Sequence, residues 1–123
     1  MKFHLANTAG LNIFTAHGEG YVQVNQQRYS RPLIVTPETL FEDWSASRFA
    51  ALTTADFSQF LQFKPEVVIL GSGPQHLFAH PQLFQALTAA GIGVEFMSTP
   101  AACRTYNILT GEDRKVAVGI LFA

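Results

Sequence analysis

Cysteine is almost missing from this sequence, because Cys103 is the only one among 123 residues. One thiol excludes an internal disulfide and a cysteine-rich zinc site, and it suits a reducing, cytoplasmic compartment. Charged residues are scarce as well, at 14% against roughly 25% in ordinary soluble domains. The net charge is −1 and the lysines and arginines are dispersed, which predicts no nucleic-acid-binding face.

Long apolar runs are also absent from the sequence. No run approaches the roughly 20 residues of a membrane-spanning helix, so no membrane insertion is expected. The first residues show neither the apolar stretch nor the cleavage pattern of a signal peptide, which again predicts a cytoplasmic protein. His76 and His80 have the spacing of helical metal ligands, but Pro81 disfavours a helix at His80 and no acid or thiol joins them. We therefore predict loop histidines, no metal and no cofactor.

Apolar residues, by contrast, are plentiful, at 48% of the sequence. A chain of this length can bury a stable hydrophobic core without the help of disulfide bonds or a bound metal. So few charges cannot cover the surface of a small domain, and part of that surface is left apolar. Because large exposed apolar patches usually mark interfaces, we expect a protein partner or self-association.

Strand patterns fill the first half of the chain, where short apolar-rich segments alternate with turn residues. The expected strands cover residues 12–16, 21–24, 28–36 and 41–44. Pro32 interrupts the third of them, which marks an edge, a bulge or a strand start. Residues 1–10 are predicted to form a loosely ordered arm, and residues 11–123 a single domain that opens with this β meander.

The second half alternates strands and helices. A helix capped by Thr53 or Thr54 precedes a continuously apolar strand at residues 67–70. The expected elements after it are a glycine turn at 71–74, a helix at 81–90, a strand at 94–97, a helix from 100 to about 111 and a strand at 116–122. Two parallel strands joined through a helix form a right-handed βαβ unit, so the predicted fold class is α/β.

The glycine turn is the first candidate binding site. Gly71, Ser72 and Gly73 follow the buried strand, and the backbone N–H groups of such a turn can face an anion. The dinucleotide fingerprint requires a third glycine where this chain has His76, and the lysine of a P-loop is missing. Two interpretations remain, a plain tight turn or a turn that binds a small anionic ligand.

Ser98, Thr99 and Arg104 extend this candidate site. If the two strands are parallel neighbours, Ser98 and Thr99 lie beside the glycine turn at the carboxyl edge of the sheet, where α/β sheets bind ligands. Arg104 would then add guanidinium donors for an anion. The alternative is that Thr99 only caps its helix and that Arg104 pairs with a surface carboxylate.

Cys103 also has two interpretations. Near a helix N-terminus and beside Arg104, its thiol would be a nucleophile with a lowered pKa, whereas in a run of small residues it would pack in the core. No Ser-His-Asp set or carboxylate pair can be assembled from the pattern, so no catalytic residue is predicted. An enzymatic activity is therefore not the leading hypothesis.

Three segments carry a resemblance to a known family, at residues 67–73, 91–99 and 101–109. They resemble a domain-of-unknown-function family that includes the mitochondrial respiratory complex I (NADH dehydrogenase) assembly factor 3, the adipogenesis-associated domain protein and bacterial stand-alone members. The family pattern maps onto eight residues of this chain, which are Gly71, Gly73, Thr99, Cys103, Arg104, Thr105, Tyr106 and Asn107.

The resemblance implies a single three-layer α/β domain around a mixed central sheet whose last strand is antiparallel to its neighbours. It also implies action through protein contacts, as an assembly factor acts, without an established catalytic activity. The leading hypothesis is therefore a small intracellular binding or assembly module. The alternative is a small-molecule or anion-binding domain, with or without catalysis, that uses the carboxyl edge of the sheet.

Overall fold

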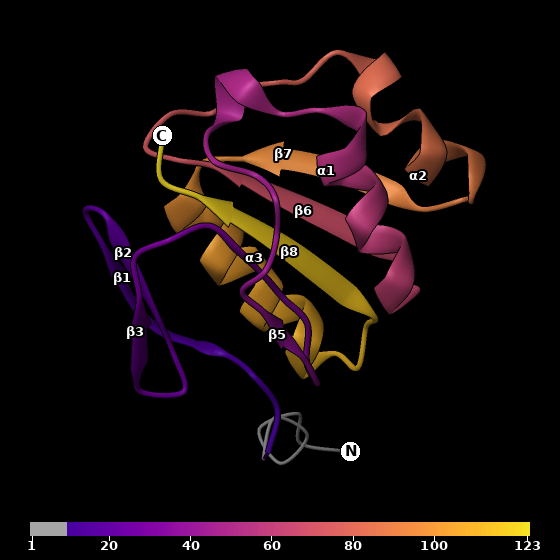
Figure 1. Cartoon of the computed structure of the whole chain (residues 1–123). Coiled ribbons are helices and arrows are strands. Elements are labelled where there is room, and N and C mark those ends of the chain that lie inside the picture. The colour runs from indigo at the N-terminus through magenta and orange to yellow at the C-terminus, as the bar shows by residue number, and fades with distance from the viewer. Residues whose placement is uncertain (1–9) are drawn as a thin grey trace.

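A computed structural model describes residues 10–123 (Figure 1). The loosely ordered arm predicted for residues 1–10 lies outside the described residues, apart from Gly10. Five strands come first along the chain: β1 (Phe14–Gly18), β2 (Tyr21–Val24), β3 (Gln27–Tyr29), β4 (Leu33–Val35) and β5 (Leu40–Phe41). The first three pair antiparallel in a small sheet, as the predicted β meander required.

Pro32 divides the segment that was expected to be one strand. The continuous strand predicted for residues 28–36 is wrong, because the chain leaves the small sheet after Tyr29 and enters a second sheet at Leu33. Proline has no N–H group to donate to a ladder, so strand pairing stops before it. The strand predicted for residues 41–44 is displaced as well, since β5 ends at Phe41.

The second half of the chain supplies β6 (Val67–Ser72), β7 (Gly93–Met97) and β8 (Val116–Leu121). With β4 and β5 they form a mixed sheet in the order β5-β4-β8-β6-β7. β8, the last of these strands along the chain, is antiparallel to β4 as expected. It is parallel to β6, so the expectation that it would be antiparallel to both neighbours is wrong on that side. The parallel pairing follows because a helix after β7 returns the chain to the starting end of β6.

Three α-helices connect these strands: α1 (Thr54–Ser58), α2 (Gln85–Ala89) and α3 (Thr99–Gly111). The predicted cap at Thr53 is confirmed as a capping box, in which the Thr53 hydroxyl accepts the Asp56 N–H and the Asp56 carboxylate accepts the Thr53 N–H. Short 3-10 helices follow α1 at Gln59–Phe63 and precede α2 at Pro81–Phe84. No helix within residues 10–123 has the length and apolar character needed to cross a membrane.

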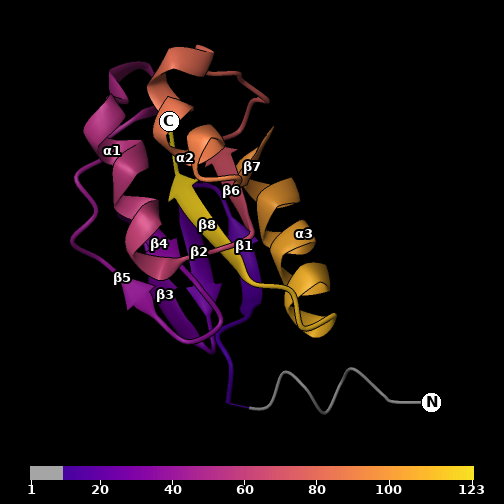
Figure 2. The same cartoon turned by 90° about the vertical axis from the view of Figure 1, so that its right-hand side faces the viewer.

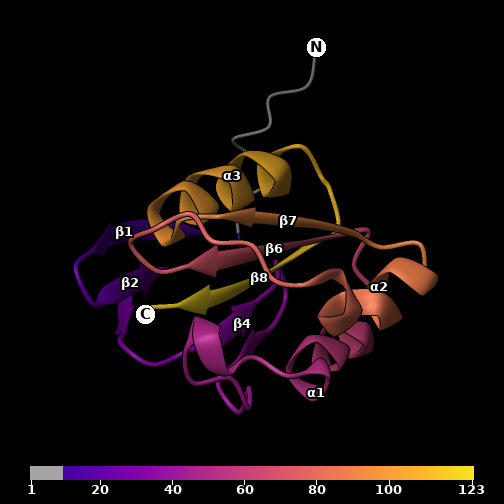
Figure 3. The same ribbon diagram turned by 90° about the horizontal axis from the view of Figure 1, so that it is seen from above.

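The molecule has three layers (Figures 2 and 3). α1 and α2 cover one face of the five-stranded sheet, and α3 and the small sheet cover the other. Side chains alternate along β8, so that Val116, Val118 and Ile120 belong to the core beneath α3, while Ala117 and Leu121 belong to the core beneath α1. β8 is buried over its whole length, which explains its continuous apolar sequence.

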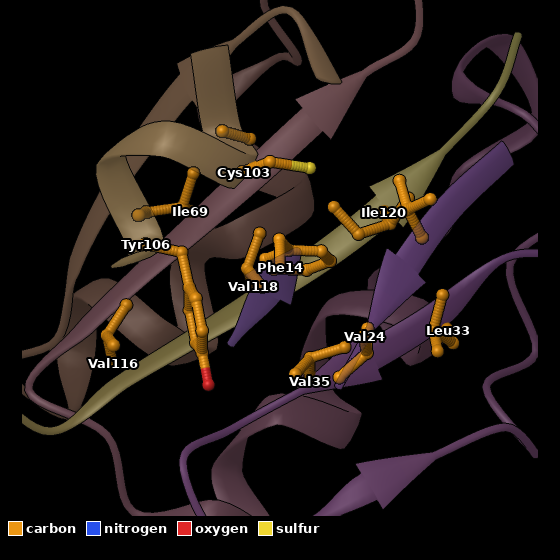
Figure 4. Close-up of a cluster of buried hydrophobic side chains, with 12 residues drawn as sticks. Phe14, Val24, Leu33, Val35, Ile69, Cys103, Tyr106, Val116, Val118 and Ile120 are labelled. Carbon is orange, nitrogen blue, oxygen red and sulfur yellow. The ribbon is translucent and has the colours of Figure 1, made fainter. Parts of the chain in front are cut away.

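The core beneath α3 is shown in Figure 4. Cys103 and Tyr106 point into it from α3, Ile69 from β6 and Phe14 from β1. The rings of Phe14 and Tyr106 pack edge to face, with their centroids 5.2 Å apart. Residues from both halves of the chain therefore share one buried cluster.

The opposite face of β8 contains a close approach at Gly119. The rings of Trp44 and Phe60 pack on each other over this residue with centroids 5.5 Å apart. A Cβ at position 119 would lie 2.7 Å from the Trp44 ring and 2.8 Å from the Phe60 ring. Neither buried ring has room to move in a close-packed core, so this position requires glycine.

We expect Gly119→Ala to lower the free energy of unfolding by about 1–3 kcal/mol, the usual cost of overpacking a core. Gly93→Ala is the matched control, because a Cβ at that position in β7 meets nothing within 4 Å. Its effect should stay within about 0.5 kcal/mol. Urea denaturation of the three proteins measures the difference, and equal destabilisation by the two substitutions would contradict this account of Gly119.

Candidate functional site

The predicted glycine turn begins two residues later than expected. Gly71 and Ser72 still belong to β6, and the chain turns at Gly73, whose φ of 89° is in the left-handed region. Gly71 allows β6 to lie directly against the start of α3, since a Cβ there would be 3.0 Å from the Thr99 hydroxyl oxygen and 3.1 Å from the Ala102 Cβ. The first glycine therefore serves helix–sheet packing.

Thr99 does not cap α3 as predicted. The N-cap is Ser98, whose hydroxyl accepts the Ala101 N–H at 3.4 Å. The buried Thr99 hydroxyl instead accepts the Gly73 N–H at 2.8 Å and donates to the Leu121 carbonyl at 2.6 Å. The Thr99 N–H also donates to the Gly73 carbonyl at 2.7 Å. One threonine thus joins the end of β6, the first turn of α3 and the end of β8.

Ser72 is also bonded within the protein. Its buried hydroxyl lies 2.5 Å from the Gln75 carbonyl and 3.2 Å from the Met97 carbonyl, and it accepts the Leu77 N–H at 3.1 Å. Five of the six candidate residues, Gly71, Ser72, Gly73, Ser98 and Thr99, therefore do meet at the carboxyl edge of the sheet. The side-chain hydroxyls there already hold loops, strands and a helix together.

Arg104, the sixth candidate residue, faces a different part of the molecule. It is exposed on α3 and lines a pocket of about 380 Å³ whose other members include His17 of β1 and Asn107. It comes five positions after Thr99 along the helix, which corresponds to a rotation of about 140° around the helix axis. The sequence correctly placed Arg104 near the N-terminal end of α3, but it could not specify which side of the helix Arg104 occupies.

Cys103 is a core residue. Its side chain is 1% exposed and packs in the cluster with Ile69 and Ile120. Burial raises the pKa of the Cys103 thiol to about 12, and the neighbouring Arg104 opposes this only in part. The packing interpretation is confirmed, because a thiol with this pKa is protonated at neutral pH and is a poor nucleophile.

Sequence reasoning missed what Tyr106 and Asn107 do. The Asn107 side-chain amide donates to the Phe14 carbonyl at 2.8 Å and accepts the Phe14 N–H at 2.9 Å, so it pairs with β1 as another strand would. The Tyr106 hydroxyl donates to the Asn12 carbonyl at 2.9 Å. These two residues fasten the small sheet to α3. An asparagine inside a helix, where it is a poor helix former, was the available signal.

The loop histidines are confirmed. His80 precedes the 3-10 helix Pro81–Phe84 and accepts the Gln82 N–H through its Nδ1 atom at 3.2 Å. His76 lies in the loop between β6 and that helix, and its ring packs against the Phe78 ring at an interplanar angle of 37°, with centroids 4.5 Å apart.

These contacts define the class of the protein. It is a mixed α/β domain in which α3 packs on the five-stranded sheet and holds the small antiparallel sheet through Tyr106 and Asn107. The family of proteins of unknown function DUF498/DUF598 matches residues 14–121, and the chain belongs to this family. The resemblance stated from the sequence is confirmed.

The relatives carry different names. Mouse NADH dehydrogenase [ubiquinone] 1 alpha subcomplex assembly factor 3 is 34% identical over 92 residues, which cover 73% of this chain and 49% of the mouse protein. The 13 kDa major membrane protein of Francisella tularensis is 27% identical over 109 residues, which cover 88% of this chain and 89% of that protein. A crystal structure of a Bordetella parapertussis protein has a TM-score of 0.87 at 40% identity and covers 93% of this chain and 98% of that one.

Two consequences follow from these relatives. The chain spans about half the length of the mouse assembly factor, so the activity of that whole protein does not transfer by similarity alone. The Francisella relative is named a membrane protein, and a cytoplasmic location for this chain therefore stays a prediction.

Thr99→Val should destabilise the fold strongly, because it keeps the side-chain shape and leaves the Gly73 N–H and the Leu121 carbonyl without partners. We expect a loss of about 2–4 kcal/mol in the free energy of unfolding, since each buried unpaired group costs roughly 1–3 kcal/mol. Thr99→Ser is the control, because it keeps the hydroxyl and should cost about 1 kcal/mol. If urea denaturation gave the same loss for both variants, the hydroxyl bridge would not be the cause.

Cys103 should react slowly with a thiol reagent such as Ellman's reagent at about pH 8, and rapidly once urea unfolds the chain. Stability should also depend on alkaline pH. The folded-state pKa is raised from 9.0 to about 12, so the stabilising effect of the buried thiol is complete below 9 and is lost as the pH rises toward 12. Fast labelling of the folded protein would contradict the burial of this thiol.

Proposed function

We propose that this protein is a binding or assembly module that acts through protein contacts and has no catalytic role. The observation that supports the proposal best is an exposed aromatic residue beside an open strand edge. Phe78 is 73% exposed and is the most exposed of the large apolar side chains within residues 10–123. Leu77 beside it is exposed as well, at 36%, and aromatic residues are enriched at protein interfaces.

Phe78 is held in place by its neighbours. Its ring packs at a tilt against the His76 ring, and its centroid lies 6.1 Å from that of the Phe96 ring, which belongs to β7. The centroid of the Phe96 ring in turn lies 5.4 Å from that of Phe84. The exposed Phe78 ring is therefore continuous with the core beneath α1. A partner that contacts Phe78 therefore meets an apolar surface that continues into the core of the domain.

β7 supplies the open strand edge. It is the last strand of the five-stranded sheet and pairs only with β6 among the described residues. The Gly93 N–H donates toward the β6 side, to the Glu66 carbonyl at 3.2 Å. Because successive residues of a strand direct their backbone groups to opposite sides, those of Val94 and Phe96 face away from β6. These groups can pair with a strand from another chain.

We infer that the partner adds an extended segment along β7 and places an apolar side chain against Phe78. Such strand addition takes its affinity from main-chain hydrogen bonds and its specificity from neighbouring pockets. A two-fold pairing of β7 with itself, centred on Glu95, would bring two carboxylates opposite each other. This repulsion favours a different protein over a second copy. The assembly-factor names of several relatives support the same class of function.

Phe78→Ser should weaken capture of the partner about thirtyfold, as expected when a central aromatic anchor worth roughly 2 kcal/mol is removed. Ile108→Ser is the matched control, because Ile108 is also exposed, at 61%, and lies on α3 in the opposite layer. The measurement is cross-linking in lysate followed by titration of the captured partner with each variant.

A second variant tests the strand edge directly. Val94→Pro removes an N–H group that faces away from β6, and it should block strand addition while the β6–β7 ladder stays intact. The midpoint of thermal unfolding checks that the variant folds. A strictly monomeric protein in light scattering that captures nothing from lysate would refute the proposed function.

A further inference from the structure

The pocket lined by Arg104 lies between α3 and β1, which run beside each other (Figure 3). α3 contributes Cys103, Arg104 and Asn107 to the lining, and β1 contributes residues 14–17. Its volume of about 380 Å³ is within the range of about 300–1,000 Å³ that is usual for ligand pockets. Asn107 bonds both backbone groups of Phe14, so the two walls are tied together whether or not a ligand is present.

A β-bulge in β1 directs His17 toward this pocket. Phe14 lies opposite Val24 of β2. His17 lies opposite Val22, so β1 has two residues between these pairs where β2 has one. Directly opposite side chains share a face of the sheet, and both valines are buried in the core beneath α3. His17 therefore faces the α3 side as Phe14 does, whereas strict alternation would have turned it to the other side. Bulges of this kind often re-aim a side chain beside a functional site.

Arg104 gives the pocket its charge. It is exposed, and its guanidinium forms no hydrogen bond or ion pair with another residue of the described range 10–123. The described residues that line the pocket include no carboxylate, and the buried thiol of Cys103 stays protonated at neutral pH. Glu19 follows His17 by two residues, in the turn beyond β1, and lies outside the lining. The lining thus carries a positive charge with no negative charge to oppose it, and it attracts an anion.

The donors on the two walls suit a phosphate group. A guanidinium presents parallel N–H groups that bind two oxygens of one oxyanion. A phosphate monoester has three terminal oxygens, so the third remains for a ring N–H of His17 from the opposite wall. A carboxylate has only two oxygens, and the guanidinium occupies both. The rest of the pocket volume leaves room for a group that carries the phosphate.

We propose that Arg104 and His17 bind a phosphate group, of free phosphate or of a small phosphate monoester, in the pocket between α3 and β1. The guanidinium of Arg104 holds two phosphate oxygens, and His17 donates to the third. The site keeps the anion that the sequence suggested for Arg104, but it places that anion away from the glycine turn. It is also separate from the proposed protein interface, whose anchor Phe78 is continuous with the core beneath α1.

Phenyl phosphate and inorganic phosphate are the probes, and benzoate and benzylamine are the controls. Titration at about pH 7.5, where phosphate is mostly a dianion, is followed in two-dimensional amide NMR spectra of the whole chain. Both phosphates should give saturable shifts centred on the amides of Ala16, His17 and Arg104. Tighter binding of phenyl phosphate would identify the ligand as an ester, and equal binding would identify it as free phosphate. Benzoate should bind about tenfold more weakly than phenyl phosphate, and benzylamine should not bind.

Substitutions separate the guanidinium from its charge. Arg104→Gln should weaken phosphate binding about tenfold, and Arg104→Lys, which keeps the charge and loses the paired donors, about threefold. His17→Ala should weaken it about threefold as well. Arg48→Gln is the matched control, because Arg48 is also exposed but lies in the segment before α1, outside the lining. Phe78→Ser should leave phosphate binding unchanged, so failure at one site is distinguishable from failure at the other.

The midpoint of thermal unfolding shows whether a loss of binding reflects the site or the fold. Arg104→Gln should leave this midpoint nearly unchanged, because the side chain is exposed and has no bonds within residues 10–123. Equal affinities of the Arg104→Gln and Arg48→Gln variants would overturn the proposal. Shifts centred away from α3 and β1, benzoate bound as tightly as phenyl phosphate, or no saturable shift at millimolar phosphate would overturn it as well.

Discussion

The carboxyl edge of the five-stranded sheet depends on the hydrogen bonds of one buried hydroxyl, that of Thr99. From the first turn of α3, this hydroxyl accepts the Gly73 N–H after β6 and donates to the Leu121 carbonyl at the end of β8. Gly71 has to lack a side chain for the helix to come this close. What resembles an anion-binding arrangement in the sequence is therefore a joint between two parallel strands and a helix.

Most of the residues that match the family pattern build the fold, and exposed Arg104 is the exception. Gly71, Thr99, Tyr106 and Asn107 hold the sheet, the helix and the small sheet together, and Cys103 fills the core between them. Relatives that share this pattern share an architecture, which is consistent with the different names that they carry. The surface that we propose for protein binding lies outside that pattern, at the exposed β7 edge and Phe78. On this proposal, the function of the protein resides at that edge and not in the residues that build the fold.

Local signals predicted most of the elements, and distant contacts account for the errors. The apolar run of β6, the Thr53 cap and the alternation of strands and helices in the second half are all set by near neighbours in the chain. The position of β8 between β4 and β6 depends on which strands pair, which periodicity does not specify. The bond from Thr99 to Leu121 spans 22 residues, and that from Asn107 to Phe14 spans 93. No pattern within a short window contains such information.

The central position of β8 has a consequence for synthesis of the chain on the ribosome. Until residues 116–121 have been made, β4 and β6 have no strand between them, and each presents an unpaired edge. The nascent chain can form the small sheet and the β6–β7 unit early, but the two parts of the large sheet remain separate. Closure of this sheet is accordingly a late and cooperative step, and incomplete chains are prone to pair with one another through those edges.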